Sequence, residues 1–322
     1  MPHPDSIAHP NADKPAYEHD PRDAAHVDPD EVNARDNYSL QCVFRTAIAI
    51  PTAETEALAN AMEEAVKATG VEIRGWYDVG GYRADADLML WALSDSADKL
   101  QAAYHALVQS ELGQMLEPVW SAMSAHKPAE FNYRHLPACF GGVVPRKYVA
   151  VYPFVRSWDW YYLPKARRSA ILKEHGMNAR DYLDVKVSTL AAFALGDYEW
   201  TIALEHDDLS RIMGVLRVQR DAEARLFVRE DTPFFTGPRV ELTEWASRQP
   251  HFGEAEGGCG CGCGEGHEHG HGHGGCGCGE GHDHGHDHGG CGCGEGHEHG
   301  GCGCGHGHKQ DVEIEDKPAS AK

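Results

Sequence analysis

The segment 253–308 most constrains how this chain can fold, because it contains no Leu, Ile, Val, Phe or Tyr. It repeats GGCGCG followed by Gly, His and acidic residues, starting at 257, 274, 289 and 300. Such a segment cannot bury an apolar core. Residues 1–36 also lack apolar periodicity. We therefore expect one folded region at 37–252, roughly 215 residues and enough for a sizeable core, between disordered ends at 1–36 and 309–322.

The acidity of the chain lies mostly outside this region. Of the formal charge of -21, the segments 1–36, 253–308 and 309–322 hold -6, -9 and -1, which leaves about -5 for 37–252. Solubility explains acidic ends, and no basic stripe suggests nucleic-acid binding. No apolar run has transmembrane length, and MPHPDSIAHP lacks the features of a secretory signal.

Cysteine usage suggests a reducing compartment. Only Cys42 and Cys139, of 11 cysteines, lie in the expected folded region. One pair in so large a domain does not indicate a disulfide scaffold, so we expect a cytoplasmic protein.

Apolar periodicity divides the folded region into two halves, about 37–145 and 146–252, with the same order of elements. For the first half we expect strands at 38–48, 71–79 and 86–93 and helices at 51–70 and 94–116. Thr52 would cap the first of these helices, and Gly70 would end it. For the second half we expect a helix that ends on Gly176 and a helix opened by Asp207 or Asp208. The second-half ranges are strand 147–155, helix 163–176, strands 185–195 and 198–206, and helix 207–227.

The repeated order of strand, helix, two strands and helix predicts an α+β fold. It fits two fused ferredoxin-like units, each an antiparallel sheet with helices on its outer face. The two sheets would curl together into a barrel-like core. Neither G-x-G-x-x-G after a strand nor a P-loop motif is present, and G-x-S-x-G and H-E-x-x-H are missing as well. The sequence thus disfavours dinucleotide-binding, serine hydrolase and zincin functions.

Two stretches resemble a known family: YPFVRSWDWYYLPKARRSAILKEHGMNARDY at 152–182 and FALGDYEW at 193–200. A Tyr-Pro pair that closes a strand, an arginine four residues on, an aromatic cluster and a helix that ends in EHG resemble the chlorite dismutase-like superfamily of haem proteins. Within it, the match is to actinobacterial coproheme decarboxylases. The resemblance covers nearly all of 37–240 and implies a dimeric α+β barrel.

The resemblance implies a role for five residues. His175, in the EHG motif, takes the place of the proximal ligand of the haem iron. Tyr152 takes the place of the tyrosine that becomes a catalytic radical, and His135 that of a distal base. Arg156 and Arg225 take the places of residues near the porphyrin propionates.

The activity implied by the resemblance is the hydrogen peroxide-dependent oxidative decarboxylation of Fe-coproporphyrin III (coproheme) to haem b. Coproheme would then be both substrate and redox cofactor. The resemblance also implies a homopentamer and transient contact with coproporphyrin ferrochelatase. Chlorite-degrading members have an arginine thirteen residues after the proximal histidine, where this chain has Ser188. We therefore do not expect chlorite dismutation.

Each assignment has a simpler alternative. His175 would by default be a solvated cation near a helix C-terminus, and Tyr152 a core aromatic. His135 would be a loop residue held by a backbone bond, and Arg156 would pair with Asp159. We expect the tryptophans at 158, 160 and 200 to lie in the core or in a pocket wall. The alternative functions are a haem or metal carrier without turnover and a haem peroxidase.

The tail itself predicts metal binding. Thiolates and imidazoles are ligands for Zn(II), Ni(II), Co(II) and Cu(I). The C-G-C spacing favours several weak, exchanging sites over one fixed site, and an inert solvated tail is the alternative. The candidate ligands are Cys259, Cys261, Cys263, His267, His269, Cys276, Cys278, His282, His284, Cys291, Cys293, His297, His299, Cys302 and Cys304.

Overall fold

The structure is a computed structural model that describes residues 20–24 and 26–253. The predicted metal-binding tail, the C-terminal end and the first 19 residues lie outside the described residues. The strands are β1 (Tyr38–Thr46), β2 (Ile50–Pro51), β3 (Glu72–Asp78), β4 (Leu88–Ser94), β5 (Leu116–Ala125), β6 (Tyr148–Arg156), β7 (Lys186–Ala191), β8 (Trp200–His206), β9 (Val228–Glu230), β10 (Phe235–Val240) and β11 (His251–Phe252). The α-helices are α1 (Pro29–Asn33), α2 (Thr55–Lys67), α3 (Ala97–Gln109), α4 (Trp158–Tyr162), α5 (Lys165–Asn178), α6 (Leu209–Arg220) and α7 (Leu242–Ser247). The 3-10 turns are η1 (Thr52–Glu54), η2 (Gly113–Met115), η3 (Ala138–Phe140), η4 (Arg180–Tyr182) and η5 (Glu223–Phe227).

The main sheet closes on itself. Its strand order is β10-β3-β4-β1-β5-β7-β8-β6-β9, and β10 also pairs with β6. The orders β3-β4-β1-β5 and β7-β8-β6-β10 are both ferredoxin-like, and the ladders of the main sheet are antiparallel. The predicted α+β class and the barrel built from two fused units are confirmed.

Five strands, among them the short β2, β9 and β11, and several helix ends were not predicted correctly. β5 and β10, the fourth strand of each unit, were missed. The helix expected at 94–116 ends at Gln109, and the one expected at 207–227 ends at Arg220. The helix expected to end on Gly176 continues to Asn178.

Of the residues expected at three other helix ends, two are confirmed and one is wrong. Asp208 caps α6, since its carboxylate accepts from the Ser210 backbone N–H at 2.8 Å. Thr52 is no cap of α2, because a 3-10 turn precedes the helix at Thr55. Gly70 lies just after α2 with φ +79°, a conformation that favours glycine.

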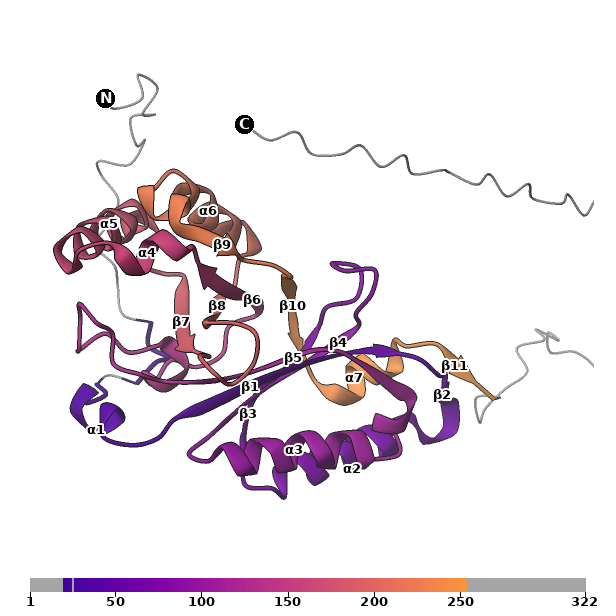
Figure 1. The fold of residues 1–322 in the computed structure, drawn as a ribbon. Helices are drawn as coiled ribbons and strands as arrows, with labels where there is room; N and C mark the ends of the chain where they lie inside the picture. The colour runs from indigo at the N-terminus through magenta and orange to yellow at the C-terminus, as the bar shows by residue number, and fades with distance from the viewer. Residues whose placement is uncertain (1–19, 25, 254–322) are drawn as a thin grey trace, which may run out of the picture. The chain divides into compact units, whose positions relative to one another are not determined.

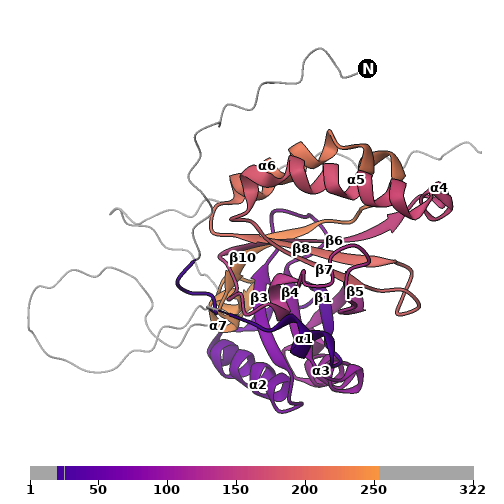
Figure 2. The same ribbon diagram turned by 90° about the vertical axis from the view of Figure 1, so that its left-hand side faces the viewer.

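The two helical layers differ in how they pack (Figure 1 and Figure 2). α2 and α3 cover the first unit, where Leu58, Met62 and Val66 recur at helical spacing on α2 and are buried. α6 covers the second unit with Ile212 and Val215. In α5, by contrast, Ile171 is the only fully buried side chain of the 14-residue helix. α5 therefore gains little stabilisation from apolar contact with the protein.

The prediction that residues 1–36 are disordered needs a partial correction, because part of this arm packs on the domain. The Asp23 carboxylate pairs with Arg146 at 2.6 Å and with Lys186 at 3.4 Å, and all three side chains are buried. Val32 of α1 is buried as well. Sequence reasoning missed this because an acidic arm with few apolar residues looks disordered, and the cations that hold it lie more than 100 residues away.

Barrel closure needs a glycine at position 237. A Cβ added there would lie 1.9 Å from the carbonyl oxygen of Asp78 in β3, whereas at Gly196 nothing lies within 4 Å. β10 and β3 are joined by only two residue pairs, Arg239 with Tyr77 and Val240 with Trp76. Any side chain at 237 would push these two strands apart.

Gly237→Ala should lower the free energy of unfolding by about 1–3 kcal/mol through overpacking. Urea denaturation followed by circular dichroism measures the change. Gly196→Ala is the matched control and should stay near the wild-type midpoint. Equal midpoints for the two variants would show that the seam between β10 and β3 tolerates a side chain.

Candidate functional site

Strand β6 places three of its residues toward the α5–α6 layer. Tyr152, Phe154 and Arg156 alternate with residues that face the barrel interior, as strand geometry requires. Across the ladder Tyr152 lies opposite Ile202, and Phe154 lies opposite Trp200 of β8. The second unit thus presents a phenol, two aromatic rings and a guanidinium on one face.

Tyr152 is 6% exposed and packs against an aromatic neighbour. Its ring stacks on Phe234, with centroids 4.4 Å apart and planes 22° apart. Burial raises the pKa of the Tyr152 phenol well above its usual range. The phenol is protonated at neutral pH, so forming its neutral radical requires loss of both an electron and a proton.

A charged cluster lies beside this phenol. Asp231 accepts from Arg220 and from Arg225, each at 2.5 Å. The two cations and the anion all act on the pKa of Tyr152, which places them within electrostatic range of its hydroxyl. Arg225 therefore lies within electrostatic range of Tyr152. Sequence reasoning missed Arg220, Asp231 and Phe234, because no motif spacing marks the DTPFF segment.

Arg156 lies between two aromatic rings, with its guanidinium carbon 4.6 Å from the Phe154 ring centroid and 4.2 Å from that of Trp160. Within residues 20–24 and 26–253 this guanidinium forms no ion pair, so the alternative pairing with Asp159 is not present. Its hydrogen-bond partner is the carbonyl oxygen of Ala224, at 3.5 Å. Burial lowers the pKa of Arg156 to about 10, which leaves it charged at neutral pH. A half-buried guanidinium without a direct ion-pair partner among these residues suits an anionic ligand.

His175 lies in the last turn of α5, and its Nδ1 is buried without a hydrogen-bond partner. Burial and, secondarily, the charge of Arg156 lower the pKa of its imidazole. The side chain is thus a neutral imidazole and not a solvated terminal cation. A neutral imidazole with a free nitrogen is the form that binds a metal.

These features fit an anionic iron porphyrin. Among the described residues, the imidazole has a nitrogen without a partner, the nearby guanidinium has no ion pair, and α5 buries one apolar side chain. A flat apolar ligand with carboxylates would satisfy all three.

The three tryptophans of this region have different environments. Trp160 is buried and Trp200 half-buried, as expected for core or pocket wall. Trp158 is 71% exposed, so its expected place in the core or a pocket wall is wrong. The guanidinium of Arg229 lies 4.2 Å from its ring centroid.

The structure does not bring His135 into contact with this group. His135 is exposed on the loop between β5 and β6, and its backbone N–H donates to the Asn132 carbonyl at 3.0 Å. The loop touches α5 through Glu130, which pairs with Arg168 at 2.7 Å. The role of His135 stays a prediction.

Ser188 faces the barrel interior, where its hydroxyl accepts from the backbone N–H of Cys139 at 3.0 Å. Counting thirteen residues from His175 therefore reaches the wrong face of β7. Thr189 pairs with Ile202 and shares the face of Tyr152, and Val187 is its neighbour on that face. Neither side chain has a guanidinium, so the argument against a chlorite-binding arginine on this strand face still holds.

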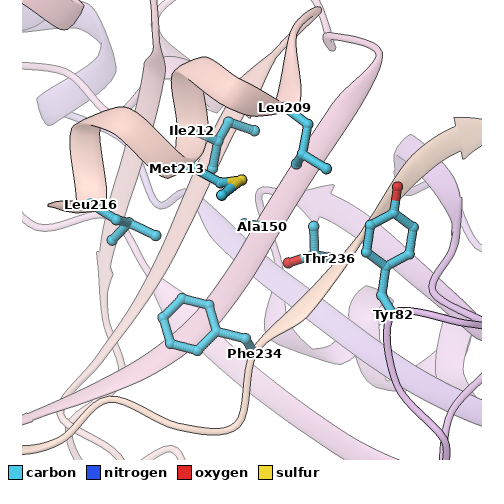
Figure 3. A pocket seen from close by; sticks show the side chains of 8 residues that line it. All are labelled: Tyr82, Ala150, Leu209, Ile212, Met213, Leu216, Phe234 and Thr236. Atoms are coloured by element: carbon cyan, nitrogen blue, oxygen red, sulfur yellow. The ribbon is translucent and has the colours of Figure 1, made fainter.

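An apolar pocket of about 250 Å³ lies beside the site, between α6 and strands β6 and β10 (Figure 3). Phe234 lines this pocket and also stacks on Tyr152. None of the five predicted site residues lines the pocket. The lining residues are Tyr82, Ala150, Leu209, Ile212, Met213, Leu216, Phe234 and Thr236.

No helix among the described residues is long and apolar enough to cross a membrane. The same residues contain no group of three or more His, Cys, Asp or Glu side chains arranged to hold a metal ion.

Comparison with known proteins supports both fold and family. The family profile "Chlorite dismutase" matches residues 53–240. The chain is 44% identical to the coproheme decarboxylase of Mycolicibacterium smegmatis over 233 residues, covering 70% of this chain and 100% of that protein. It is 23% identical to the coproheme decarboxylase of Staphylococcus saprophyticus, covering 58% and 84%. A chlorite dismutase variant from Candidatus Nitrospira defluvii superposes with a TM-score of 0.59 at 19% identity, covering 65% and 93%.

The lowered pKa of His175 gives a pH prediction. In the ligand-free protein its imidazole should titrate below the ordinary value of 6.5. Because folding favours the neutral form, charging this group opposes folding, and its contribution to stability decreases as the pH falls below 6.5. NMR titration of the ring protons measures the midpoint, and His175→Gln assigns the signal.

Arg156→Gln removes the second cause and should raise that midpoint, while burial keeps it below 6.5. A midpoint at or above 6.5 in the wild-type protein would contradict the buried, neutral imidazole.

Proposed function

This chain belongs to the chlorite dismutase family, and on that premise we propose that it decarboxylates Fe-coproporphyrin III to haem b with hydrogen peroxide. One observation supports this most: the His175 imidazole has a nitrogen without a hydrogen-bond partner and lies within electrostatic range of Arg156, which is on the same strand as Tyr152. Relatives named coproheme decarboxylase, one of them 44% identical over its whole length, support the substrate.

The proposed reaction converts two propionate side chains into vinyl groups. For each one, the carboxylate leaves as carbon dioxide, one hydrogen leaves the β-carbon, and two electrons are removed. One hydrogen peroxide takes up these two electrons and, with two protons, becomes two molecules of water. The balance is R–CH2CH2COO⁻ + H2O2 + H⁺ → R–CH=CH2 + CO2 + 2 H2O.

Binding falls to residues of α5, β6 and η5. The neutral imidazole of His175 would hold the iron, and bound iron supplies the redox chemistry that reduces peroxide. Arg156, a planar cation already oriented by two rings, would bind one carboxylate. Arg225 would bind another beside Tyr152.

Tyr152 is the proposed radical residue. The phenol loses one electron and its proton, and the resulting tyrosyl radical takes a hydrogen atom from the propionate β-carbon. A second electron then leaves, the bond to the carboxylate breaks, and the vinyl group forms. Burial supports this role, because Tyr152 is kept from water and exclusion of water protects a radical from side reactions.

His135 would accept the proton from peroxide, since a neutral imidazole can act as a general base. Its exposed position on the loop allows proton exchange with solvent. The proposal further includes a homopentamer that receives coproheme from coproporphyrin ferrochelatase, both by family resemblance. It also includes a cytoplasmic location, which rests on the cysteine usage.

Tyr152→Phe should bind Fe-coproporphyrin III as the wild-type protein does and lose decarboxylation. The ring and its stacking on Phe234 remain, while the hydrogen-atom acceptor is gone. Absorbance of the bound porphyrin measures binding, and the mass of the porphyrin after peroxide titration measures loss of carboxyl groups.

Phe234→Leu is the matched control, because it removes the stacking partner and keeps the phenol; it should retain turnover. Turnover in Tyr152→Phe would exclude the proposed radical. Bound substrate without any mass loss in the wild-type protein would favour a carrier, and oxidation of an added dye without mass loss would favour a haem peroxidase.

We also propose that the Cys/His tail is a metal buffer that binds Zn(II), Ni(II), Co(II) or Cu(I) in several weak sites. Its composition supports this, with 9 Cys and 12 His within residues 253–308. A chain that ends at Gly253 should keep wild-type decarboxylation and lose most of its bound Zn(II) or Ni(II), measured by equilibrium dialysis. Unchanged metal stoichiometry would indicate an inert tail, and loss of turnover would place the tail in the catalytic cycle.

A further inference from the structure

Asp231 binds two arginines at once. Its carboxylate accepts from Arg220 of α6 and from Arg225 of η5, each at 2.5 Å. The Asp231 side chain is 13% exposed, whereas both arginine side chains are 40% exposed. The anion is therefore confined, and the two cations are accessible to a ligand.

The position of Asp231 is set by its own chain segment. Phe234 follows three residues later and stacks on Tyr152 at 4.4 Å between centroids. Asp231 and the aromatic neighbour of the phenol thus belong to the same connection between β9 and β10. The cluster is held next to the place where the proposed reaction occurs.

The two arginines expected to bind carboxylates differ in their ion pairs with the protein. Within the described residues Arg156 has no ion pair, whereas Arg225 is already paired with a carboxylate of the protein. A substrate propionate that takes the same Nη1 of Arg225 would therefore compete with Asp231 for it. Asp231 can release Arg225 without becoming an unpaired buried charge, because Arg220 still holds it.

We propose that Asp231 is a specificity-determining residue that exchanges Arg225 with the reacting carboxylate of the substrate. Asp231 holds Arg225 in the empty site, yields it to a propionate and takes it back once that propionate has become a vinyl group. This inference rests on the proposed function. No covalent bond changes in the exchange, and the free energy of the restored ion pair favours release of haem b.

The exchange predicts a change in relative affinity. In Asp231→Asn, Arg225 has no carboxylate to leave, so Fe-coproporphyrin III should bind more tightly. Haem b lacks the carboxylate that replaces Asp231, so its affinity should change less. The ratio of the haem b to the Fe-coproporphyrin III dissociation constant should rise about fivefold, the upper end for a solvent-accessible ion pair.

The experiment titrates each porphyrin into the full-length protein without peroxide and follows porphyrin absorbance. Asp184→Asn is the matched control, because Asp184 also binds an arginine of α6, Arg211 at 2.5 Å, and its loss changes the net charge equally. Its ratio should stay at the wild-type value. In an Arg225→Gln background, Asp231→Asn should no longer change the ratio.

Four results would overturn the exchange: an unchanged ratio, a lower ratio, an equal rise in Asp184→Asn, or a rise that persists without Arg225. A merely structural role would weaken both porphyrins alike and leave the ratio constant. If the wild-type protein does not bind Fe-coproporphyrin III, the proposed function fails and this inference fails with it.

Discussion

Strand β6 has paired neighbours on both sides and side chains in two different environments. Val149 and Val151 fill the barrel interior, while Tyr152 and Arg156 face the α5–α6 layer. Because the side-chain period of a strand is two residues, a shift by one residue would exchange these sets. It would place a guanidinium in the barrel and remove the phenol from the site. The pairing of β6 with β8 and β10 therefore fixes the fold and the chemistry together.

The two units use the same topology for different ends. In the first unit, α2 and α3 bury rows of apolar residues against the sheet and form the largest core. In the second, among the described residues, His175 of α5 has a ring nitrogen without a hydrogen-bond partner and Arg156 of β6 has no ion-pair partner. Unsatisfied groups of this kind cost free energy that the rest of the protein must offset. The well-packed first unit supplies stability, and the second contains the groups that can bind a ligand.

Sequence reasoning succeeded where periodicity is local. The β–α–β–β–α order of each unit follows from runs of apolar residues, and the barrel follows from the repetition. β5 and β10 were missed because Pro118 interrupts one and Gly237 with Pro238 interrupts the other. What specifies these strands is pairing with distant strands, Thr46 to Leu116 for β5 and Arg239 to Tyr77 for β10.

The same limit applies to the site. Tyr152, Arg156 and His175 lie within one continuous stretch that resembles a family, so sequence alone could propose them. Asp231 and Phe234 could not be proposed from the sequence, because they reach the site only through the pairing of β9 and β10 with β6. Ser188 shows the opposite failure, since a residue count along the chain cannot tell which face of β7 a side chain occupies.

The weak packing of α5 has a consequence for the fate of the protein without ligand. A helix that buries one side chain opens locally at low cost. A ligand bound only by the closed form would stabilise it in proportion to the logarithm of its concentration. Resistance of this region to proteolysis would then follow the supply of porphyrin. The lifetime of the chain in a cell would therefore be coupled to the availability of its substrate.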